Sequence, residues 1–389
     1  MKLITTWIAA GGLLAALAAA QPAPHYTITD LGTFGGAGTN SGAYQMNQAG
    51  WVGGAANQTS GGPQHAFLWY GGGQLHDLGT LGGSACSGCN SGADGPNAAG
   101  EAAIDSEIST PDPNGEDFCQ YGTHAECLGA IWRNGKMTAL PTLVGGNNAS
   151  AFNLNIQGQV IGFSENGVAD STCSQATPYQ VIRFEPVIWG PTGTLQELAP
   201  LSGDTVAFAT GVNDLGQVVG VSGLCSNTGL PPIYANGPHA VLWQKDGTAV
   251  NLGSLGGGTV TNAATSINNL EEVVGGSQSP EDGYVHPFLW TPSKGMQDLG
   301  ILSGDTFAVA PCCNTVNNKS QVVGQSCPGP YGGCRAFLWQ NGVLSDLNTL
   351  IPSDSGMYLE FANSINDAGE IAGCALINGE LHAVVLTPR

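Results

Sequence analysis

Short apolar runs alternate along the whole chain with turns that contain glycine or asparagine. Runs such as Ala66–Trp69 and Val218–Val221 have the length of a β-strand, and turn residues bound them on both sides. Glycine is 60 of 389 residues, while lysine, glutamate and arginine, which favour helices, are scarce. The pattern therefore predicts an all-β protein made of many short strands and tight turns.

Three short signatures recur in a fixed order, which indicates a repeat architecture. The first is an asparagine followed by a glycine turn and Val-x-Gly, as in Asn213–Gly220. Its seven asparagines are separated by 49 to 58 residues and are Asn47, Asn97, Asn155, Asn213, Asn268, Asn317 and Asn366. The copy at Asn97 is degenerate.

The second and third signatures also occur seven times each. The second is His-Ala-Phe-Leu-Trp, seen at His65–Trp69, and its first position is filled by His65, Leu128, Glu185, His239, His286, Arg335 and His382. The third is Asp-Leu-Gly-Thr-Leu-Gly-Gly, seen at Asp77–Gly83, and its first copy begins at Asp30, before any asparagine signature. We interpret the tryptophan that ends six copies of the second signature as a core residue between repeats; stacking on sugars is the alternative.

The order of the signatures predicts how the ring of repeats closes. Each repeat supplies four strands, but the last one, Phe361 to Pro388, supplies three, and the strand at Tyr26 to Gly32 has no repeat of its own. Placing that strand in the last repeat leaves no open sheet edge. We expect a seven-bladed β-propeller with four-stranded blades, closed by the N-terminal strand in the last blade. A β-solenoid would not need this offset.

These motifs resemble the HAF repeat family of probable extracellular bacterial repeats. His65-Ala66-Phe67 and the segment Asp77–Gly83 carry the resemblance, which covers almost all of the chain after residue 25. Leu128 and Glu185 depart from the pattern. The resemblance implies export from a bacterium and a repeat fold, and it transfers no activity or catalytic residue.

The N-terminus has the pattern of a secretory signal peptide. Lys2 precedes an apolar stretch, and small residues at Ala18–Ala20 fit a cleavage site before Gln21. We expect a signal peptide over residues 1–20, a short linker over 21–25 and one propeller domain over 26–389. An uncleaved membrane anchor is the alternative, and no later stretch is long enough to span a membrane. The predicted location is periplasmic or secreted.

Charge narrows the class of partner. Loss of Lys2 leaves 8 basic against 29 acidic residues, a net charge near −21. Such a surface repels nucleic acids and anionic lipid headgroups. It is compatible with a neutral polymer, a cationic partner or bound calcium.

Eleven cysteines in an exported chain predict disulfides and, because the number is odd, at least one thiol that is free or pairs with another molecule. We expect the local pairs Cys119–Cys127 and Cys327–Cys334. Cys86-x-x-Cys89 fits a structural disulfide better than a redox or zinc motif, since no second such pair exists. Cys312 and Cys313 are adjacent and are expected to pair with different partners.

Strand direction sorts the loops onto two faces. The long insertions Ala102 to Cys127, Ser164 to Arg183 and Ser222 to Pro238 all join second and third strands, so they share one face. We expect the partner to bind on this elaborated face, because functional loops are held on rigid scaffolds; the alternative is that the disulfides there only fix long loops. The candidate contact residues on this face are Tyr121, Tyr179, Tyr234, Tyr284 and Tyr331.

Several acidic and histidine positions suggest chemistry. Asp112, Asn114 and Glu116 place oxygen atoms on one tight loop, as calcium binding requires, although a solvated acidic loop is the simpler interpretation. Asp204 and Asp305 both follow Leu-Ser-Gly, where they either point toward the central channel as binding or acid–base groups or cap a turn. Histidines at the start of the second signature are expected to begin strands rather than to hold a metal.

Three functions remain open. The first is a non-catalytic binding module that presents its disulfide-braced face to an extracellular glycan, an envelope component or a protein. The second is a hydrolase or lyase of extracellular polysaccharide that uses carboxylates at the mouth of the channel. The third is a structural protein that assembles through an odd cysteine or exposed edges. No nucleophile elbow, phosphate loop or metalloprotease motif is present, and calcium is the one cofactor that the sequence suggests.

Overall fold

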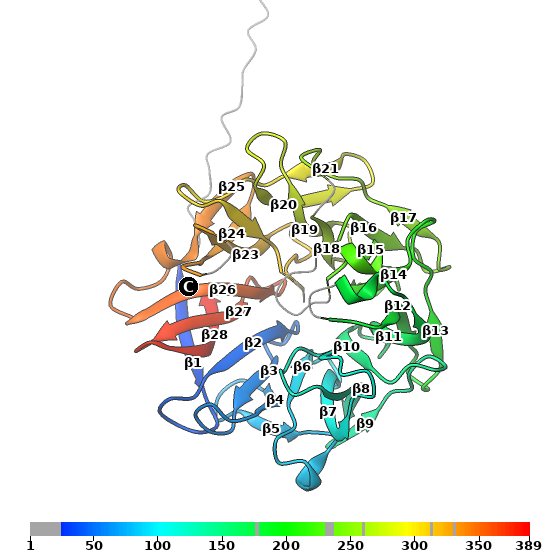
Figure 1. The fold of residues 1–389 in the computed structure, drawn as a ribbon. Coiled ribbons are helices and arrows are strands. Elements are labelled where there is room, and N and C mark those ends of the chain that lie inside the picture. The colour runs from blue at the N-terminus through cyan, green and yellow to red at the C-terminus, as the bar shows by residue number, and fades with distance from the viewer. Residues whose placement is uncertain (1–24, 176–178, 230–236, 259–260, 312–313, 330–331) are drawn as a thin grey trace, which may run out of the picture.

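The computed structural model describes residues 25–175, 179–229, 237–258, 261–311, 314–329 and 332–389. In these residues the regular structure is β-strand, apart from four single-turn 3-10 helices: η1 (Gly83–Ala85), η2 (Cys173–Gln175), η3 (Cys225–Asn227) and η4 (Leu347–Thr349). The strands form antiparallel sheets that stand in a ring around a central axis (Figure 1). The predicted signal peptide, residues 1–20, lies outside the described residues.

The first four repeats each form a four-stranded sheet whose strands follow chain order. Repeat 1 holds β2 (Ser41–Met46), β3 (Val52–Asn57), β4 (Gln64–Trp69) and β5 (His76–Gly79), and repeat 2 holds β6 (Ser91–Asp94), β7 (Ala102–Pro111), β8 (Ala125–Arg133) and β9 (Lys136–Ala139). Repeat 3 holds β10 (Ala149–Leu154), β11 (Val160–Ala169), β12 (Ile182–Trp189) and β13 (Leu195–Glu197), and repeat 4 holds β14 (Val206–Val212), β15 (Val218–Gly223), β16 (His239–Trp243) and β17 (Ala249–Asn251).

The fifth and sixth repeats are joined by one parallel pairing, Val285 with Phe307, so they count as a single eight-stranded sheet. Repeat 5 holds β18 (Asn262–Ile267), β19 (Val273–Gln278), β20 (Val285–Thr291) and β21 (Gly295–Asp298), and repeat 6 holds β22 (Phe307–Val309), β23 (Val322–Cys327), β24 (Arg335–Gln340) and β25 (Val343–Asp346). Repeat 7 holds β26 (Met357–Ile365), β27 (Ile371–Ile377) and β28 (Glu380–Pro388).

The fourth strand of repeat 7 comes from the other end of the chain. Strand β1 (Tyr26–Gly32) pairs antiparallel with β28, with Tyr26 opposite Pro388 and Asp30 opposite Val384. This is the pairing that the offset of the signatures predicts. It joins the first described strand to the last one and leaves β28 without a free edge.

The asparagine signature forms a chain of hydrogen bonds from repeat to repeat. The Oδ1 atom of Asn213 accepts from the backbone N–H groups of Leu215 and Gln217, at 3.1 and 3.0 Å, and so caps its own turn. Its Nδ2 atom donates to the carbonyl oxygen of Asn268 in the next repeat, at 3.1 Å. The same link joins Asn47 to Asn97, Asn97 to Asn155, Asn155 to Asn213, Asn268 to Asn317, Asn317 to Asn366 and Asn366 to Asn47, which makes a closed cycle.

The glycine of Val-x-Gly is required by close packing between the first and second strands. A Cβ atom on Gly220 would lie 2.0 Å from the carbonyl oxygen of Phe208, and one on Gly275 would lie 1.9 Å from that of Ala263. Strand β14 carries a bulge between Ala209 and Gly211, directly opposite. Only glycine leaves room for that carbonyl oxygen, which explains why the residue recurs.

The second and third signatures meet across the third and fourth strands of a repeat. In repeats 1, 5 and 7 a histidine Nδ1 lies 2.8 to 3.0 Å from an aspartate oxygen: His65 with Asp77, His286 with Asp298, and His382 with Asp30. In repeat 6, Arg335 reaches Asp346 at 3.3 Å. These three histidines therefore pair with the aspartate that begins the third signature.

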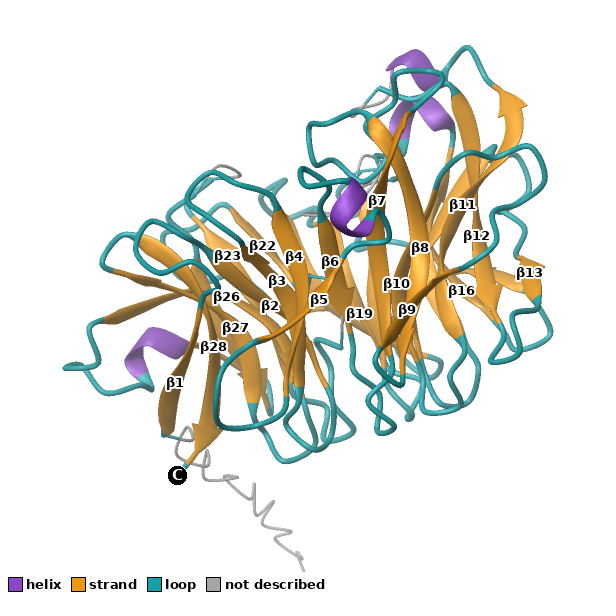
Figure 2. Cartoon of the chain, turned by 90° about the horizontal axis from the view of Figure 1, so that it is seen from below, coloured by secondary structure: helices purple, strands orange, loops and turns teal. Residues whose placement is uncertain are grey.

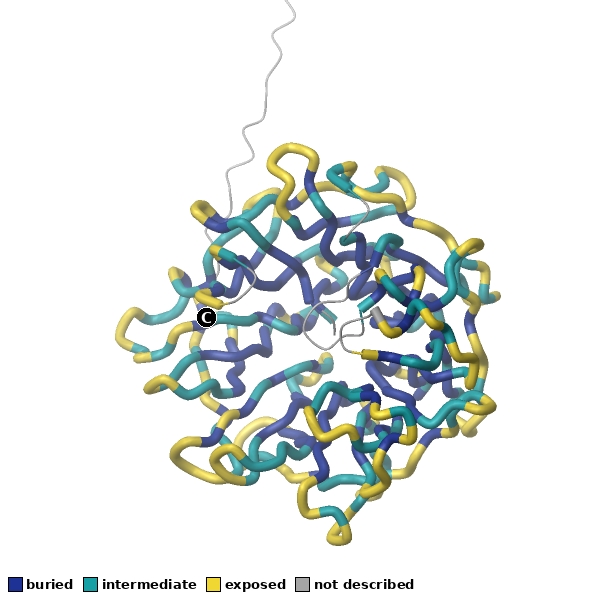
Figure 3. The backbone as a smooth tube through the Cα atoms, in the orientation of Figure 1, coloured by how far each residue is buried: buried dark blue, intermediate teal, exposed yellow. Residues whose placement is uncertain are grey.

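The hydrophobic core lies between neighbouring repeats. Figure 3 shows the inner strands buried and the outer loops exposed. One cluster joins Phe67 and Trp69 of repeat 1 to Ala383 and Val385 of repeat 7. All six signature tryptophans belong to such clusters, as a core role requires, and Trp243 also donates to the carbonyl oxygen of Ala199 at 2.8 Å. No helix among the described residues is long and apolar enough to cross a membrane.

Candidate binding site

A cavity of about 530 Å³ lies at the axis on the face of the long loops. Strands of repeats 1, 2, 3, 6 and 7 form its wall, and residues 118–121, from the loop between β7 and β8, form part of its rim. Figure 2 shows that these loops rise farther from the strands on one side of the ring than on the other. A volume of this size is typical of a site for a small molecule or a short oligomer.

One repeat position supplies much of this wall. The residue after the last position of Val-x-Gly lines the cavity in five repeats, where it is Ala55, Asp105, Phe163, Gln325 and Cys374; in repeat 2 that last position is Ile104 instead of glycine. The residues around this position repeat, but the position itself differs in every copy. The repeats thus share the residues that build the fold, while the residue that lines the cavity differs from repeat to repeat, as expected of a ligand site.

The lining combines aromatic rings, amides and carboxylates. Its aromatic residues are Tyr44, Phe118, Tyr121, Phe152, Phe163 and Phe361. Its amides are Asn40, Asn57, Gln64, Gln120, Gln325 and Asn363, and its carboxylates are Asp94 and Asp105. Amides and carboxylates offer directional hydrogen bonds to hydroxyl groups, and the rings offer flat apolar surface.

Tyr121 and Asp105 form the best-defined polar contact in the cavity. The Tyr121 hydroxyl donates to Asp105 Oδ2 at 2.5 Å, and the Gln64 side chain hydrogen-bonds to the hydroxyls of both Tyr121 and Tyr44. Gly92 makes space for the group, since a Cβ atom there would lie 3.1 to 3.3 Å from Asp105, Tyr121 and Tyr44. Tyr44 comes from β2, Asp105 from β7 and Tyr121 from a long loop, and the three side chains meet next to Gly92 of β6.

Burial sets the ionisation of this group. It raises the pKa of Asp105 to about 6; the hydrogen bond from Tyr121 opposes the rise, and the negative charge of Glu107 adds to it. Burial also raises the pKa of Tyr44, with the charges of Asp105 and Asp94 adding to the effect. Near neutral pH the two tyrosines are therefore protonated hydrogen-bond donors, and Asp105 titrates close to physiological pH.

The loop that carries Tyr121 is held at both ends. The ring of Phe118 packs 5.2 Å from that of Phe163, within a cluster of aromatic rings in repeats 3 and 4. Cys119 is bonded to Cys127. The two cysteines of this disulfide lie on either side of Tyr121 in the chain, and Phe118 anchors the segment before it in the core, so the loop around Tyr121 is held in place.

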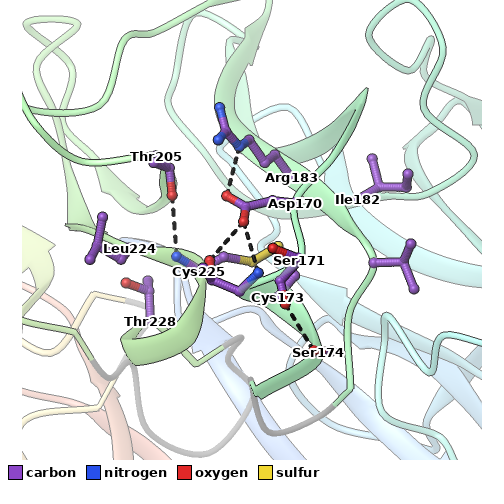
Figure 4. Close-up of a disulfide and its surroundings, with 12 residues drawn as sticks. Asp170, Ser171, Cys173, Ser174, Ile182, Arg183, Thr205, Leu224, Cys225 and Thr228 are labelled. Carbon is purple, nitrogen blue, oxygen red and sulfur yellow. Dashed lines mark hydrogen bonds and ion pairs between the residues drawn. A yellow bond between two sulfur atoms is a disulfide. The ribbon is translucent and has the colours of Figure 1, made fainter.

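Disulfides brace the same face elsewhere. The two local pairs that the sequence predicts, Cys119–Cys127 and Cys327–Cys334, are both present, and Cys86 is bonded to Cys89. A fourth disulfide, Cys173–Cys225, links the long loops of repeats 3 and 4 beside an ion pair between Asp170 and Arg183 (Figure 4). Cys312 and Cys313 lie outside the described residues.

Cys374 is the free cysteine of the described chain. It lies inside β27 and lines the cavity. Burial raises the pKa of its thiol to about 12. It is therefore an uncharged, weakly nucleophilic wall residue.

Of the candidate tyrosines that the structure describes, one lines the cavity and two do not. Tyr121 lines the cavity, but Tyr179 and Tyr284 are 50% and 40% exposed and do not contribute to it. Tyr234 and Tyr331 lie outside the described residues. Tyr121 lies three residues after Phe118, whose ring packs in the core, and this loop segment lines the cavity.

Asp204 and Asp305 are not among the residues that line the cavity. Asp204 Oδ2 accepts from Ser222 at 2.6 Å and lies 2.9 Å from His239 Nδ1. Asp305 Oδ2 accepts from Ser326 at 2.7 Å and from Arg335 at 2.8 Å. Each carboxylate thus interacts with side chains of its own repeat.

The calcium candidates lie in a buried acidic cluster beside the cavity loop. Asp112, Glu116 and Glu165 place carboxylate oxygens within 4.8 Å of one another, and Asn114 donates to Glu116 at 3.3 Å. N–H groups already bind these oxygens: Asn148 Nδ2 lies 2.7 Å from Asp112 Oδ2 and 3.0 Å from Glu165 Oε1. Burial raises the pKa of Glu165 to about 8, and the charge of Glu116 adds to the rise, so the cluster can be compensated by a proton as well as by a cation.

Comparisons with known proteins support the fold of this chain but do not assign it to a family. No family model matches the chain, and no curated protein matches it. The solved structure of a puromycin hydrolase aligns over 93% of this chain and 56% of its own, with 11% identity and a TM-score of 0.55. A streptogramin B lyase aligns over 94% of this chain and 98% of its own, with 9% identity and a TM-score of 0.50. These similarities support a propeller-like all-β fold and carry no information about activity.

Proposed function

We propose that this chain is an exported, HAF-like propeller of seven blades that works as a binding module. The closed cycle of seven asparagine links and the pairing of β1 with β28 support the blade count and the closure. The disulfides favour an oxidising compartment outside the cytoplasm.

The composition of the axial cavity carries the functional proposal. Six aromatic rings, six amides and two carboxylates line it, and its most polar contact, between Tyr121 and Asp105, leaves hydroxyl and carboxylate groups facing the cavity. This combination suits a hydroxyl-rich ligand, because amides and carboxylates bind hydroxyl groups while rings stack on the apolar faces of a sugar. The proposed ligand is an extracellular glycan that inserts a short segment into the cavity.

The proposal moves the binding surface from the loop tips to the axis. Exposed Tyr179 and Tyr284 stand on loops outside the cavity and make no contact with its lining group. Burial of ligand surface on several sides gives more affinity than contact with scattered exposed rings.

A glycan array followed by calorimetric titration tests the proposal on the purified protein without residues 1–20. We expect a selective glycan, and we expect Tyr121→Ala to weaken its binding at least tenfold, which corresponds to about 1.4 kcal/mol. Tyr284→Ala is the matched control and should leave the affinity unchanged. Equal losses in the two variants, or no glycan bound by the wild-type protein, would overturn the proposal, and release of reducing ends during the titration would replace it with a hydrolase.

A further inference from the structure

The charged side chains that line the axial cavity are all acidic among the residues that the structure describes. Asp94 and Asp105 line it, and no lysine, arginine or histidine does so among its described lining residues. Glu107 and Glu360 lie close enough for their charges to act on Asp105 and Cys374 respectively. A hollow lined by one sign of charge with low-dielectric walls concentrates ions of the opposite sign.

The aromatic lining adds a second preference for positive charge. Tyr44, Tyr121, Phe152 and Phe361 all face the same cavity as the two carboxylates. The face of an aromatic ring attracts ammonium groups, and the attraction increases when the cation is withdrawn from water. Carboxylates and rings together select an ammonium group over a neutral group of equal size.

We infer that the cavity recognises a sugar with a free, protonated amino group, held at Asp105, with its hydroxyl groups on the surrounding amides. This inference rests on the proposed function and names its ligand class. Tyr121 acts as a positioning residue, since its hydroxyl fixes Asp105 Oδ2 at 2.5 Å. Gly92 keeps open the space in which Tyr44, Tyr121 and Asp105 meet.

A bare metal ion fits the cavity less well. Calcium takes six to eight oxygen ligands at about 2.3 to 2.6 Å. The cavity offers two carboxylates among six amides and six aromatic rings, spread over about 530 Å³. Its size and its apolar rings match an organic cation.

Two oligosaccharides that differ only in charge give the sharpest test. Calorimetric titration at pH 7 compares a glucosamine tetramer with an N-acetylglucosamine tetramer, in which acetylation removes the positive charges. We expect the glucosamine tetramer to bind at least tenfold more tightly, and 0.5 M sodium chloride to reduce this ratio. The comparison uses the wild-type protein, so it does not depend on how any variant folds.

A charge-neutral variant locates the effect. Asp105→Asn keeps the shape of the side chain and should bring the two tetramers to within about twofold of each other. Asp246→Asn removes a fully exposed carboxylate outside the cavity and should leave the ratio unchanged. Equal binding of both tetramers by the wild-type protein would overturn this inference and leave the proposed function standing; if neither these tetramers nor any glycan on the array binds, both fall.

Discussion

The side-chain amide of Asn366 donates to the carbonyl oxygen of Asn47, 319 residues earlier in the chain, at 3.4 Å. This contact closes a cycle in which each repeat is tied to the next by the same amide. Each amide has two roles, because its oxygen caps the local turn while its nitrogen reaches the neighbour. The cycle explains why the asparagine recurs when much of each repeat varies.

Removing one link should destabilise the whole ring. Asn213→Ala deletes the caps on Leu215 and Gln217 and the bond to Asn268, and it leaves buried polar groups unpaired. We expect a loss of about 2–4 kcal/mol in the free energy of unfolding, measured by denaturant titration. Asn269→Ala, at the exposed neighbouring position, should cost less than about 1 kcal/mol; similar losses for both would contradict a special role for the cycle.

The histidine–aspartate pairs should make stability depend on pH. Burial lowers the pKa of His286, but its hydrogen bonds to Asp298 and Asp282 and their negative charges outweigh this, so the net pKa is raised. A histidine with a raised folded-state pKa stabilises the folded protein. The full contribution is present below the unfolded-state pKa of about 6.5, and it is lost as the pH rises through the folded-state pKa.

We therefore expect His286→Leu to destabilise the protein more at pH 5.5 than at pH 8.5. Thermal unfolding at the two pH values measures the difference. His76→Leu changes an exposed histidine and serves as the control. A deficit in His286→Leu that is the same at both pH values would show that packing, and not charge, is what the histidine contributes.

A buried carboxylate in repeat 3, Glu185, should destabilise the protein at neutral pH. Glu185 stands where other repeats have histidine, and burial raises its pKa to about 8, with the charge of Glu197 adding to the rise. Its Oε2 atom is buried without a hydrogen-bond partner. Because the folded-state pKa of Glu185 is raised, the free energy of unfolding decreases as the pH rises from about 4.5 to 8.

Glu185→Gln should remove that penalty. We expect it to stabilise the protein by roughly 2–3 kcal/mol at pH 7 and to have little effect at pH 4.5, as measured by unfolding at each pH. Glu281→Gln, at an exposed site, should have little effect at either pH. An unchanged or lower stability of Glu185→Gln at pH 7 would mean that the carboxylate is compensated, for example by a bound cation.

Binding of a cationic sugar should also follow the ionisation of Asp105. Tyr121, Tyr44 and Glu107 lie near this carboxyl group, and its pKa of about 6 means that it is mostly protonated at pH 5. A cation favours the ionised form, so the affinity for the glucosamine tetramer should rise about tenfold between pH 5 and pH 7. Calorimetry on Asp105→Asn should show a much flatter profile, whereas a profile as steep as that of the wild type would assign the titration to another group.

Much of the architecture could be predicted because every repeat repeats its local signals. The offset of Asp30 from the other signatures predicts the pairing of β1 with β28, and short sequence separation predicts Cys119–Cys127 and Cys327–Cys334. Cys173 and Cys225 are 52 residues apart, and their bond depends on how two long loops lean together, which no local pattern encodes.

The cavity was less accessible to sequence reasoning. Asp105 and Tyr44 belong to no signature, and Asp105 stands at a repeat position that differs in every copy. Comparing the copies for the position that varies, rather than for those that recur, would have indicated Asp105, Phe163 and Cys374 as lining residues. The recurring motifs identify residues that the fold requires. The candidate ligand site lies at positions where the fold does not restrict the residue type.

The most direct test of the account is a crystal structure of the protein without residues 1–20, grown with a glucosamine tetramer. The account predicts sugar density in the axial cavity, with an amino nitrogen within hydrogen-bonding distance of Asp105 and a ring against Tyr44 or Tyr121. An empty axial cavity with sugar bound instead at the exposed loops around Tyr179 or Tyr284 would contradict it.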